Sequence, residues 1–494
     1  MICLRFQMNW KDTFEASKIM NLQTFINSHM GKAFVLIQGL GFVGSVMSLV
    51  VANAINGDYA VIGVDKDTET GRKNVDSINN GIFPVLADDP KITEYFKAAC
   101  KKGNFFATVD PSAYAVADVI IVDINLDVSK TCKENNALID YTVDLGPYTA
   151  AMETIGVHCK PDALILVETT VPPGTCKSIV APVIKNALEK RGLSTDKIRI
   201  GHSYERVMPG PNYVDSIQNF YRVYSGVDET SADAVEKFLK TIISTDKFPL
   251  TRLGNTNATE MAKVLENSYR AMNIAFVVEW SRMAEEAGVD LYEVVNAIRQ
   301  RTTHNNLMYP GIGVGGYCLT KDPLLASWAR MNLIGGKDRL PQSEMAVSIN
   351  DQMPYYAYEF LRNRFQKPLQ DKKVLLLGVS YRGDVADTRF SPVEPFCRYL
   401  LSAQAKVSTH DPYVSDWVEL KMKPHKVLLE AIQEHPDILI ITTGHRVYKT
   451  EETIDALLEC NQMLVYDTIG LLAMDQISKL QKKHKVIVLG RGDL

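Results

Sequence analysis

The chain has 494 residues, 46% of them hydrophobic and 23% charged, which is the composition of a globular protein with roughly two to four domains. Its formal net charge of −4 excludes a general attraction to nucleic acid or to anionic membrane surfaces. The eight cysteines show no Cys-X-X-Cys pair and no metal-ligand spacing, so we expect no disulfide framework and no metal site, as in a reducing cytoplasm.

Residues 1–30 mix charged and apolar positions and lack the apolar core of a signal peptide. This pattern predicts a short helical extension rather than a targeting segment. No apolar run in the chain reaches the ~18–20 residues that a membrane-spanning helix needs. We therefore expect no membrane partner and a cytoplasmic protein.

A dinucleotide-binding unit is predicted directly after this extension. A β-rich run at 34–38 is followed by the pattern Gly-X-Gly-X-X-Gly at 39–44, by a helical stretch at 45–55 and by a second strand at 59–65. The glycine pattern alone is weak evidence. The order strand, glycines, helix, strand and terminal acid is specific for a Rossmann fold.

Each position of this unit has a predicted task. Gly39 permits the tight turn, Gly41 lets the pyrophosphate approach the backbone, and Gly44 lets helix and strand pack closely. Asp65 is predicted to bind the ribose hydroxyls and would repel a 2′-phosphate, so we expect NAD rather than NADP. The predicted cofactor-binding positions are Gly39, Gly41, Phe42, Val43, Gly44, Asp65 and Thr170.

Polar turns follow the next strands of the predicted doubly wound parallel sheet. These strands are expected at 118–123, 163–167 and 197–201. Because ligands of open α/β sheets bind at the carboxyl ends of the strands, Thr170, Glu205 and Arg206 are candidate site residues. The alternative for the turn at 170–174, which contains two prolines and a glycine, is a purely rigid connection.

A long helix with few breakers is predicted at 258–286. Lys263, Asn267 and Arg270 lie at i, i+4 and i+7 on one of its faces. This polar stripe faces either a site or solvent, and the spacing alone does not distinguish the two. Shorter helices complete a helical middle region, and a helix at 343–365 leads to the last domain.

A second Rossmann-like sheet is predicted in the last part of the chain. Its strands are expected at 373–379, 406–410, 437–442, 463–466 and 485–489. Its first turn, at 380–392, lacks the glycine pattern and is rich in cationic and hydroxyl side chains, which suits a pyrophosphate or a different nucleotide. The expected domains are a helical extension at 1–30, an NAD-binding Rossmann domain at 31–240, a helical domain at 241–342 and a nucleotide-binding domain at 343–494.

Cys318 lies in a loop at 309–323 that carries four glycines within six residues. Glycines at this density disfavour helix and strand and allow close backbone approach. Lys321 and Asp322 follow the thiol, so Cys318 is predicted to be a positioned nucleophile with charged partners. The alternative is a small buried hydrophobe after a turn. Two nucleotide folds that flank such a loop imply two nucleotide-bearing ligands that meet at one thiol.

From about residue 33 to near the C-terminus, the chain resembles the nucleotide-sugar 6-dehydrogenases of the UDP-glucose/GDP-mannose dehydrogenase family. The motifs that carry this resemblance are the glycine pattern at 39–44, Thr-Val-Pro-Pro-Gly-Thr at 170–175, Glu-Arg-Val-Met-Pro-Gly at 205–210, Lys263 with Asn267, the Cys318 loop, Asp-Thr-Arg at 387–389 and Ser-Pro at 391–392. The resemblance implies two Rossmann-like domains, a helical domain with a long central helix, a homodimer formed through that helix, NAD as cofactor and a UDP-sugar as substrate.

The implied reaction is a four-electron oxidation of a sugar C6 alcohol to a carboxylate through a cysteine thiohemiacetal and thioester, with two NAD+ used in turn. The implied catalytic residues are Cys318 as nucleophile, Lys263 and Asn267 for the oxyanion, Asp322 and Glu205 for the water, and Thr170 for the reacting hydroxyl. Lys263 is also expected to lower the pKa of the thiol. The implied substrate-binding residues are Glu205, Arg206, Lys263, Asn267, Tyr309, Gly311, Gly313, Gly315, Arg382 and Arg389, with the loop glycines letting the sugar nucleotide lie against backbone.

Four features of the sequence bear on the identity of the sugar. Pro209 stands where glucose-type members often carry a second carboxylate, and Val-Gly-Gly at 314–316 is similar to the N-acetylhexosamine branch. Tyr317 stands where that branch usually has histidine, and Lys321 is more similar to the glucose branch. We favour a UDP-N-acetylhexosamine over UDP-glucose. The other readings are a two-electron hydroxyacid or 6-phosphogluconate dehydrogenase, which needs no cysteine, and a non-catalytic NAD-binding redox sensor with Cys318 as its switch.

Overall fold

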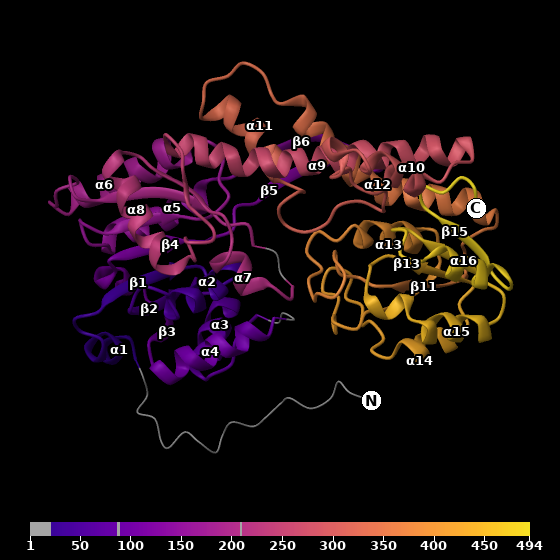
Figure 1. The fold of residues 1–494 in the computed structure, drawn as a ribbon, viewed down its shortest axis with the longest axis horizontal. Helices are drawn as coiled ribbons and strands as arrows, with labels where there is room; N and C mark the ends of the chain where they lie inside the picture. The colour runs from indigo at the N-terminus through magenta and orange to yellow at the C-terminus, as the bar shows by residue number, and fades with distance from the viewer. Residues whose placement is uncertain (1–20, 86–88, 208–209) are drawn as a thin grey trace.

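The computed structural model describes residues 21–85, 89–207 and 210–494, which form two α/β bodies below a layer of long helices (Figure 1). Helix α9 (Thr256–Ala287) spans the distance between the N-terminal body, coloured indigo to magenta, and the C-terminal body, coloured orange to yellow. Of the predicted extension at 1–30, helix α1 (Leu22–Ser28) is present, and residues 1–20 lie outside the described part of the chain.

The N-terminal body contains an eight-stranded sheet in the order β10-β9-β8-β7-β4-β1-β2-β3. Its strands are β1 (Ala33–Gln38), β2 (Tyr59–Val64), β3 (Phe105–Thr108), β4 (Val119–Val122), β7 (Leu164–Val167), β8 (Arg199–Tyr204), β9 (Val223–Gly226) and β10 (Thr251–Arg252). The predicted Rossmann architecture is confirmed, with two differences. The strand expected at 197–201 continues to Tyr204, and β9 is antiparallel to β8.

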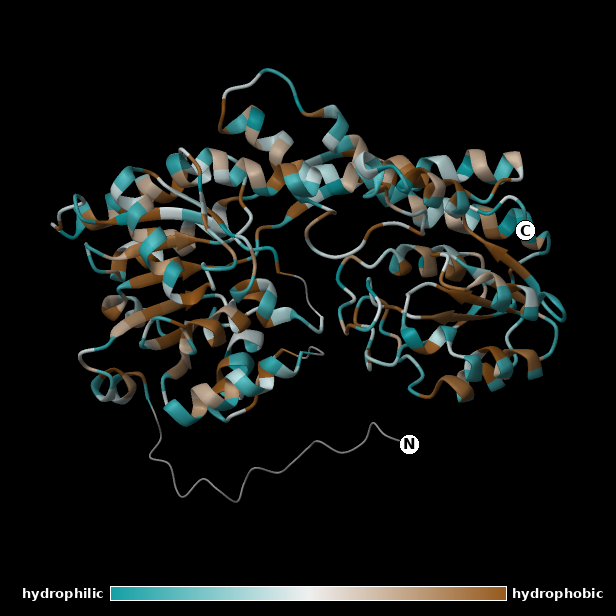
Figure 2. Ribbon diagram, viewed as in Figure 1, coloured by the Kyte–Doolittle hydropathy of each residue, from teal (hydrophilic) through white to brown (hydrophobic). Residues whose placement is uncertain are grey.

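Helices cover both faces of this sheet. They are α2 (Phe42–Ala52), α3 (Glu69–Asn79), α4 (Pro90–Lys102), α5 (Gly146–His158), α6 (Ala181–Lys190), α7 (Tyr213–Gln218) and α8 (Glu229–Ile242), with shorter turns at η2 (Pro111–Val116) and η3 (Cys176–Val180). In β1, Phe34 and Leu36 pack into one core, and Val35 and Ile37 pack into the other. Burial on both faces explains why the strands are continuous apolar runs, brown in Figure 2.

A hairpin that the sequence analysis missed, β5 (Val128–Cys132) and β6 (Leu138–Val143), follows strand β4. It reaches the long helix α12 (Pro341–Phe365), where Lys130 of the hairpin pairs with Asp351 at 2.6 Å. Most of the hairpin's side chains are exposed or half-buried. The apolar alternation that marks a strand in a sequence is therefore weak here.

The middle of the chain is helical, as predicted, and consists of α9, α10 (Leu291–Arg299), α11 (Asp322–Asn332), α12 and a short turn η4 (Thr302–His304). The 32-residue helix α9 begins after Asn255, whose side chain accepts from the Ala258 amide, and it ends at Gly288 in the left-handed conformation. The small side chains of Ala271 and Ala275 let α9 approach Ala346 of α12 closely.

The C-terminal body contains a five-stranded parallel sheet in the order β12-β11-β13-β14-β15. Its elements are β11 (Lys373–Leu377), α13 (Val393–Ser402), β12 (Lys406–His410), α14 (Leu428–Gln433), β13 (Ile438–Ile441), η5 (Arg446–Lys449), α15 (Glu451–Glu459), β14 (Leu464–Asp467), α16 (Met474–Gln481) and β15 (Lys485–Val488). All five predicted strands are present. Among the described residues, no helix combines the length and the apolar character needed to cross a membrane.

Glu260 fixes helix α9 to the carboxyl edge of the N-terminal sheet. Its buried carboxylate accepts hydrogen bonds from the backbone amides of Gly174 at 2.6 Å and Cys176 at 2.8 Å. These amides belong to the turn that follows β7 and leads into η3. Because Lys263 lies one helical turn further along α9, this contact also determines where Lys263 is placed relative to the sheet.

We expect Glu260→Gln to lower the free energy of unfolding by about 1–3 kcal/mol, because one of the two buried amides then faces an NH2 group instead of an acceptor. Urea unfolding measures this loss. Glu279→Gln, at an exposed position of the same helix, is the matched control and should leave the stability unchanged. Equal stabilities of the two variants would contradict the anchoring role.

Candidate active site

Cys318 lies in the turn that leads into helix α11, in the part of the sequence between the N-terminal and the C-terminal body. The backbone amides of Lys321 and Asp322 donate to the Cys318 carbonyl at 3.2 and 2.9 Å, and Asp322 is the first residue of the helix. The Cys318 residue is accessible to solvent. The loop therefore holds an accessible thiol close to the positive end of a helix, where a thiolate is favoured.

The loop glycines are needed because the protein itself fills the space beside them. A Cβ at Gly315 would lie 2.5 Å from the Tyr381 Cβ and 2.9 Å from the Phe390 carbonyl oxygen, and one at Gly313 would lie 2.9 Å from the Asn350 carbonyl oxygen. At Gly313 and Gly315 the loop packs directly on α12 and on the C-terminal body, which is a reason for glycine that the sequence did not show. The contact of the loop glycines with a sugar nucleotide stays a prediction.

Lys263 and Glu205 form one side of the site. Lys263 Nζ donates to the Glu205 carbonyl oxygen at 2.8 Å and lies 3.7 Å from its Oε1 atom. The Lys263 side chain is 7% exposed and the Glu205 side chain 12% exposed. Glu205 directly follows β8, and Lys263 comes from α9, so their pairing depends on the contact between helix and sheet.

Asn267 and Asp322 form the other side of the site. Asn267 Nδ2 donates to Asp322 Oδ2 at 2.6 Å, and Lys321 Nζ donates to Asp322 Oδ1 at 2.9 Å. Asp322 is fully buried. The polar face predicted for the long helix thus divides: Lys263 is buried, Asn267 meets Asp322, and Arg270 is exposed to solvent.

Burial of the thiol opposes its ionisation in this state and outweighs the favourable position at the helix start. Protein atoms surround the accessible thiol closely, and this burial raises the pKa of Cys318 to about 11; the Asp322 anion adds to the rise and the Lys263 cation opposes it. Burial also works against the charge of Lys263, but Glu205, Cys318 and Asp322 outweigh it and raise the pKa of the ammonium. The Lys263 cation lowers the pKa of the thiol, as expected, but it does not outweigh burial and the Asp322 anion, so attack by Cys318 requires a base.

The dinucleotide loop has the geometry that its glycines predict. A Cβ at Gly44 would lie 1.9 Å from the Gly39 carbonyl oxygen, whereas nothing lies within 4 Å of the Cβ position at Gly41. Gly41 precedes α2 without a side-chain cap. The start of α2 is thus open to a ligand phosphate, and Asp65 follows β2 as a ribose ligand should. These residues fit NAD.

Arg389 and Tyr317 connect the C-terminal body to this loop. Asp387 binds Arg389 through two hydrogen bonds of 2.9 and 2.7 Å. The guanidinium lies 4.3 Å from the ring centre of Phe42, which is the first residue of α2, and 5.9 Å from that of Tyr317. Tyr317 donates to Asp127 of the N-terminal body at 2.6 Å. The neighbours of Cys318 and the cofactor loop therefore meet across the two bodies.

Four further predicted site residues, Arg206, Tyr309, Thr170 and Gly311, have neighbours other than the groups described above. Arg206 donates to Glu266 of α9 at 3.0 Å, and Tyr309 donates to Asn296 of α10 at 2.6 Å. Thr170 is half-buried just beyond β7. Gly311 faces Thr468 and Ile469, both 3.9 Å from its Cβ position. Of the motif at 205–210, residues 208–209 lie outside the described residues.

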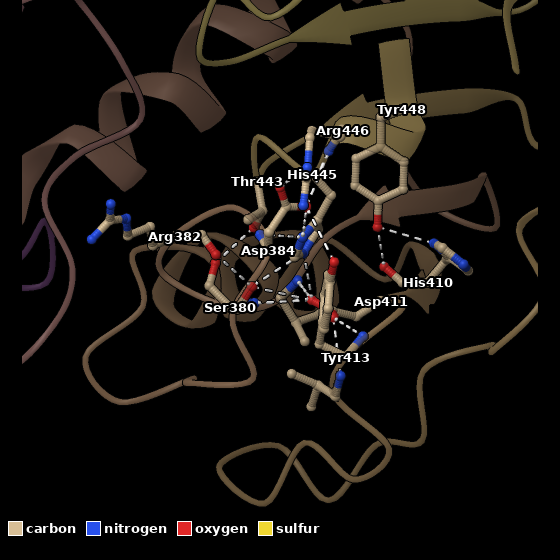
Figure 3. Close-up of polar contacts among 12 residues, drawn as sticks. Ser380, Arg382, Asp384, His410, Asp411, Tyr413, Thr443, His445, Arg446 and Tyr448 are labelled. Atoms are coloured by element: carbon tan, nitrogen blue, oxygen red, sulfur yellow. Dashed lines mark hydrogen bonds and ion pairs between the residues drawn. The ribbon is translucent and has the colours of Figure 1, made fainter. Parts of the chain in front are cut away.

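The first loop of the C-terminal sheet is arranged differently from a dinucleotide loop (Figure 3). Its amides at Val379 and Ser380 donate to Asp411 Oδ2 at 2.9 and 3.2 Å. His445 Nε2 lies 3.1 Å from the same oxygen, while the Arg382 side chain extends away from the cluster. The Asp411 carboxylate thus takes the amides that would bind a pyrophosphate, and the pKa of Asp411 is lowered to about 2 by His445 and these amides despite its burial.

Four polar residues with buried side-chain atoms were not selected from the sequence. Asp123 follows β4, Glu168 follows β7, His202 lies in β8, and Arg222 precedes β9. The first two end apolar strand runs, which is a usable signal, whereas nothing in the local sequence marks Arg222 as buried. Among the described residues, no group of three or more His, Cys, Asp or Glu side chains could hold a metal ion.

We expect Asp322→Asn to increase the alkylation rate of Cys318 by iodoacetamide near neutral pH, because the anion that raises the thiol pKa is removed. Lys263→Met should decrease the rate. A change of one unit in pKa changes the thiolate fraction about tenfold. Mass spectrometry of the Cys318 peptide measures the rate, and the exposed Cys100 serves as an internal control. Changes in the same direction in both variants would contradict this account.

Comparison with known proteins agrees with this geometry. Three models of the UDP-glucose/GDP-mannose dehydrogenase family match: the NAD binding domain at residues 33–243, the central domain at 257–351 and the UDP binding domain at 375–474. The UDP-N-acetyl-D-mannosamine dehydrogenase of Methanocaldococcus jannaschii is 31% identical over 471 residues, which cover 94% of this chain and 97% of that protein.

Solved structures give the same result. The structure of the UDP-D-ManNAc dehydrogenase from Pyrococcus horikoshii is 26% identical with a TM-score of 0.76, and the match covers 93% of this chain and 100% of that one. The UDP-glucose dehydrogenase from Pyrobaculum islandicum, at 22% identity, has the same fold with a TM-score of 0.75 over 92% of this chain and 97% of its own. The chain therefore belongs to the UDP-glucose/GDP-mannose dehydrogenase family and carries its NAD binding and UDP binding domains.

Proposed function

We propose that this protein is an NAD-dependent nucleotide-sugar 6-dehydrogenase that oxidises the C6 alcohol of a UDP-N-acetylhexosamine to the carboxylate. The observation that carries this proposal is the convergence of Cys318, Lys263, Glu205 and Asp322 between an open dinucleotide loop and the UDP binding domain. A two-electron dehydrogenase has no use for a nucleophile in this place, whereas oxidation of an aldehyde to an acid requires one.

Cys318 is the proposed nucleophile of the second oxidation. NAD+, when bound, supplies the hydride acceptor for both oxidations. The Cys318 sulfur bonds to the aldehyde carbon after its proton passes to a neighbouring carboxylate, and the new thiohemiacetal loses a hydride and a proton to become a thioester. Water then breaks the carbon–sulfur bond, which returns the thiol and releases the acid.

Lys263 and Asn267 are proposed to stabilise the oxygen of the bound carbonyl, because both donors come from one face of α9 and Lys263 stays an ammonium. Asp322 and Glu205 are proposed to orient the water and to take up its proton, with Thr170 at the reacting hydroxyl. Arg382 and Arg389 are the proposed cations for the nucleotide diphosphate of the sugar. We also propose the domain limits 31–240 for the NAD-binding domain, 241–342 for the helical domain and 343–494 for the UDP-sugar-binding domain.

The sugar is proposed from the site motifs and from the names of the relatives. The Methanocaldococcus jannaschii relative is a UDP-N-acetyl-D-mannosamine dehydrogenase, and Pro209 replaces the second carboxylate of glucose-type members. UDP-glucose is the alternative substrate, since Lys321 and Tyr317 depart from the N-acetylhexosamine pattern. Incubation with UDP-ManNAc, UDP-GlcNAc, UDP-GalNAc, UDP-glucose and GDP-mannose in parallel distinguishes them by which sugar is oxidised.

A homodimer through α9 is proposed from an apolar stripe on that helix. The exposed members of this stripe are Met261, Leu265, Tyr269, Phe276, Trp280 and Met283. Their spacing places them along one side of the helix, and their exposed fractions range from 46% to 64%. A continuous apolar surface of this kind is typical of a contact with another protein, and a second copy of the chain would cover it symmetrically.

The redox-sensor alternative assigns Cys318 a regulatory disulfide. The described cysteines are all unpaired, which supports the cytoplasm as the proposed compartment. Lys263, Asn267 and Asp322 are buried or half-buried, and each takes part in a hydrogen bond with a charged partner or from a charged group. A redox sensor would not need these residues. Tight NAD binding with no NADH formed from any sugar nucleotide would support the sensor.

We expect about two NADH per UDP-sugar oxidised by the wild-type enzyme and no acid product from Cys318→Ser, because a hydroxyl cannot form the thioester. Absorbance of NADH and chromatography of the sugar product measure the two quantities. Cys100→Ser, at an exposed cysteine, is the matched control and should behave as wild type. A ratio of one NADH, or acid formation by Cys318→Ser, would refute the proposal.

We expect Leu265→Asp combined with Trp280→Asp to convert a dimer into a monomer, because two charges would be buried in the apolar stripe. Light scattering coupled to size exclusion measures the mass. Val418→Asp, at a 78% exposed apolar position of the C-terminal body, is the control and should stay dimeric. A dimer in the double variant would rule out this face as the interface.

A further inference from the structure

A row of buried polar groups crosses the carboxyl edge of the N-terminal sheet, outside the catalytic set described above. Gln38 ends β1, Asp123 follows β4, Glu168 follows β7, Ser203 lies in β8, and Arg222 precedes the antiparallel strand β9. Glu168 is 1% exposed and Arg222 is 2% exposed. The sheet topology thus brings charged side chains from separate strands to one edge, just below Glu205.

The hydrogen bonding of this row is incomplete. Arg222 Nη2 pairs with Glu168 Oε1 at 3.1 Å. Within the described part of the chain, the buried atoms Arg222 Nε and Nη1, Glu168 Oε2 and Asp123 Oδ2 have no hydrogen-bond partner. Donors and acceptors that are buried without partners are costly. A buried carboxylate oxygen without a donor favours the neutral, protonated form of its carboxyl group.

The charges of the row do not balance. Two carboxyl groups of the row, Asp123 and Glu168, face one cation, Arg222, and the neighbouring Glu205 and Lys263 add one charge of each sign. One negative charge is therefore in excess if every group is ionised. A buried excess charge is relieved most simply by binding one proton. His202 of β8 does not supply a further cation, since burial lowers its pKa to about 3.

We propose that Asp123 and Glu168 hold one proton between them, and that this shared proton makes the pair a positioning group that keeps Glu205 available as a base beside Lys263. The part of this inference that concerns catalysis rests on the proposed function. The part that concerns the shared proton rests only on the structure. The pair is not among the predicted catalytic or sugar-binding residues. It acts through the charge that it presents to Glu205.

The electrostatics of both carboxyls agree with this proposal. Burial raises the pKa of Asp123 well above its usual range, and the negative charges of Glu168 and Glu205 add to the effect. Burial raises the pKa of Glu168 to about 7, although the Arg222 cation opposes the rise. Asp123 therefore holds a proton more firmly than Glu168, and Glu168 ionises first as the counter-ion of Arg222.

The reaction gives such a pair a task. Oxidation of one alcohol to a carboxylate by two NAD+ and one water releases three protons, which must leave through groups near the thiol. An ionised Asp123 would place another negative charge near Glu205, in a site that already holds an excess of carboxyl groups. A protonated Asp123 avoids this repulsion.

Infrared spectroscopy of the protein without cofactor or substrate tests the shared proton. At about pH 8, the wild type should show the carbonyl band of a neutral carboxylic acid, and both Asp123→Asn and Glu168→Gln should lose it. In Glu168→Gln the remaining Asp123 ionises as the counter-ion of Arg222. Asp118→Asn, at the amino end of the same strand β4, where Asp118 pairs with the half-exposed Lys160, is the matched control and should keep the band.

A band that persists in both Asp123→Asn and Glu168→Gln would overturn the proposal, whatever the activity of the enzyme. The pH profile of kcat/KM is the second readout. Asp123→Asn should keep wild-type activity near neutral pH within about threefold and extend it to higher pH, because the amide cannot ionise. Thermal melting verifies that each variant is folded. A profile of Asp123→Asn that falls with the wild type at alkaline pH would contradict the positioning role.

Discussion

The arrangement of the active site depends on the burial of one cation, the ammonium of Lys263. A buried ammonium costs several kcal/mol unless carboxylates or other acceptors surround it. Here Glu205 supplies both a carbonyl and a carboxylate from the end of β8, and Asp322 adds its charge from the start of α11. Helix, sheet and cysteine loop therefore have to meet at a single place, and the Glu260 anchor keeps α9 there.

The two Rossmann-like sheets differ because of what occupies their first loops. In the N-terminal sheet, the loop before α2 has no side-chain cap and open space beside Gly41. In the C-terminal sheet, Asp411 accepts from the corresponding loop amides. The same topology thus presents an anion site to a dinucleotide in one body and satisfies its own amides in the other. This contrast agrees with the NAD binding and UDP binding domains that the family models assign.

The parts of the fold that can be predicted from the sequence are those determined by interactions between residues close together in the chain. The glycine pattern at 39–44 and the apolar strand runs fix the Rossmann elements, and the break-free run after residue 258 fixes the long helix. The extension of β8 to Tyr204 was missed because His202 and Ser203 are polar yet fully buried. The raised pKa of the Cys318 thiol and the burial of Arg222 could not be predicted from the sequence either, because both arise from contacts between residues far apart in the chain.

The central claim, that Cys318 forms a covalent bond to the oxidised sugar, can be tested on the enzyme itself. The Asp322→Asn enzyme is mixed with UDP-N-acetylhexosamine and NAD+, quenched in acid and digested, and the Cys318 peptide is analysed by mass spectrometry. Because Asp322 is proposed to orient the hydrolytic water, this variant should hydrolyse the thioester slowly, and the account predicts that the peptide carries a uronyl thioester during turnover. Formation of the sugar acid with an unmodified Cys318 peptide at every time point would contradict it.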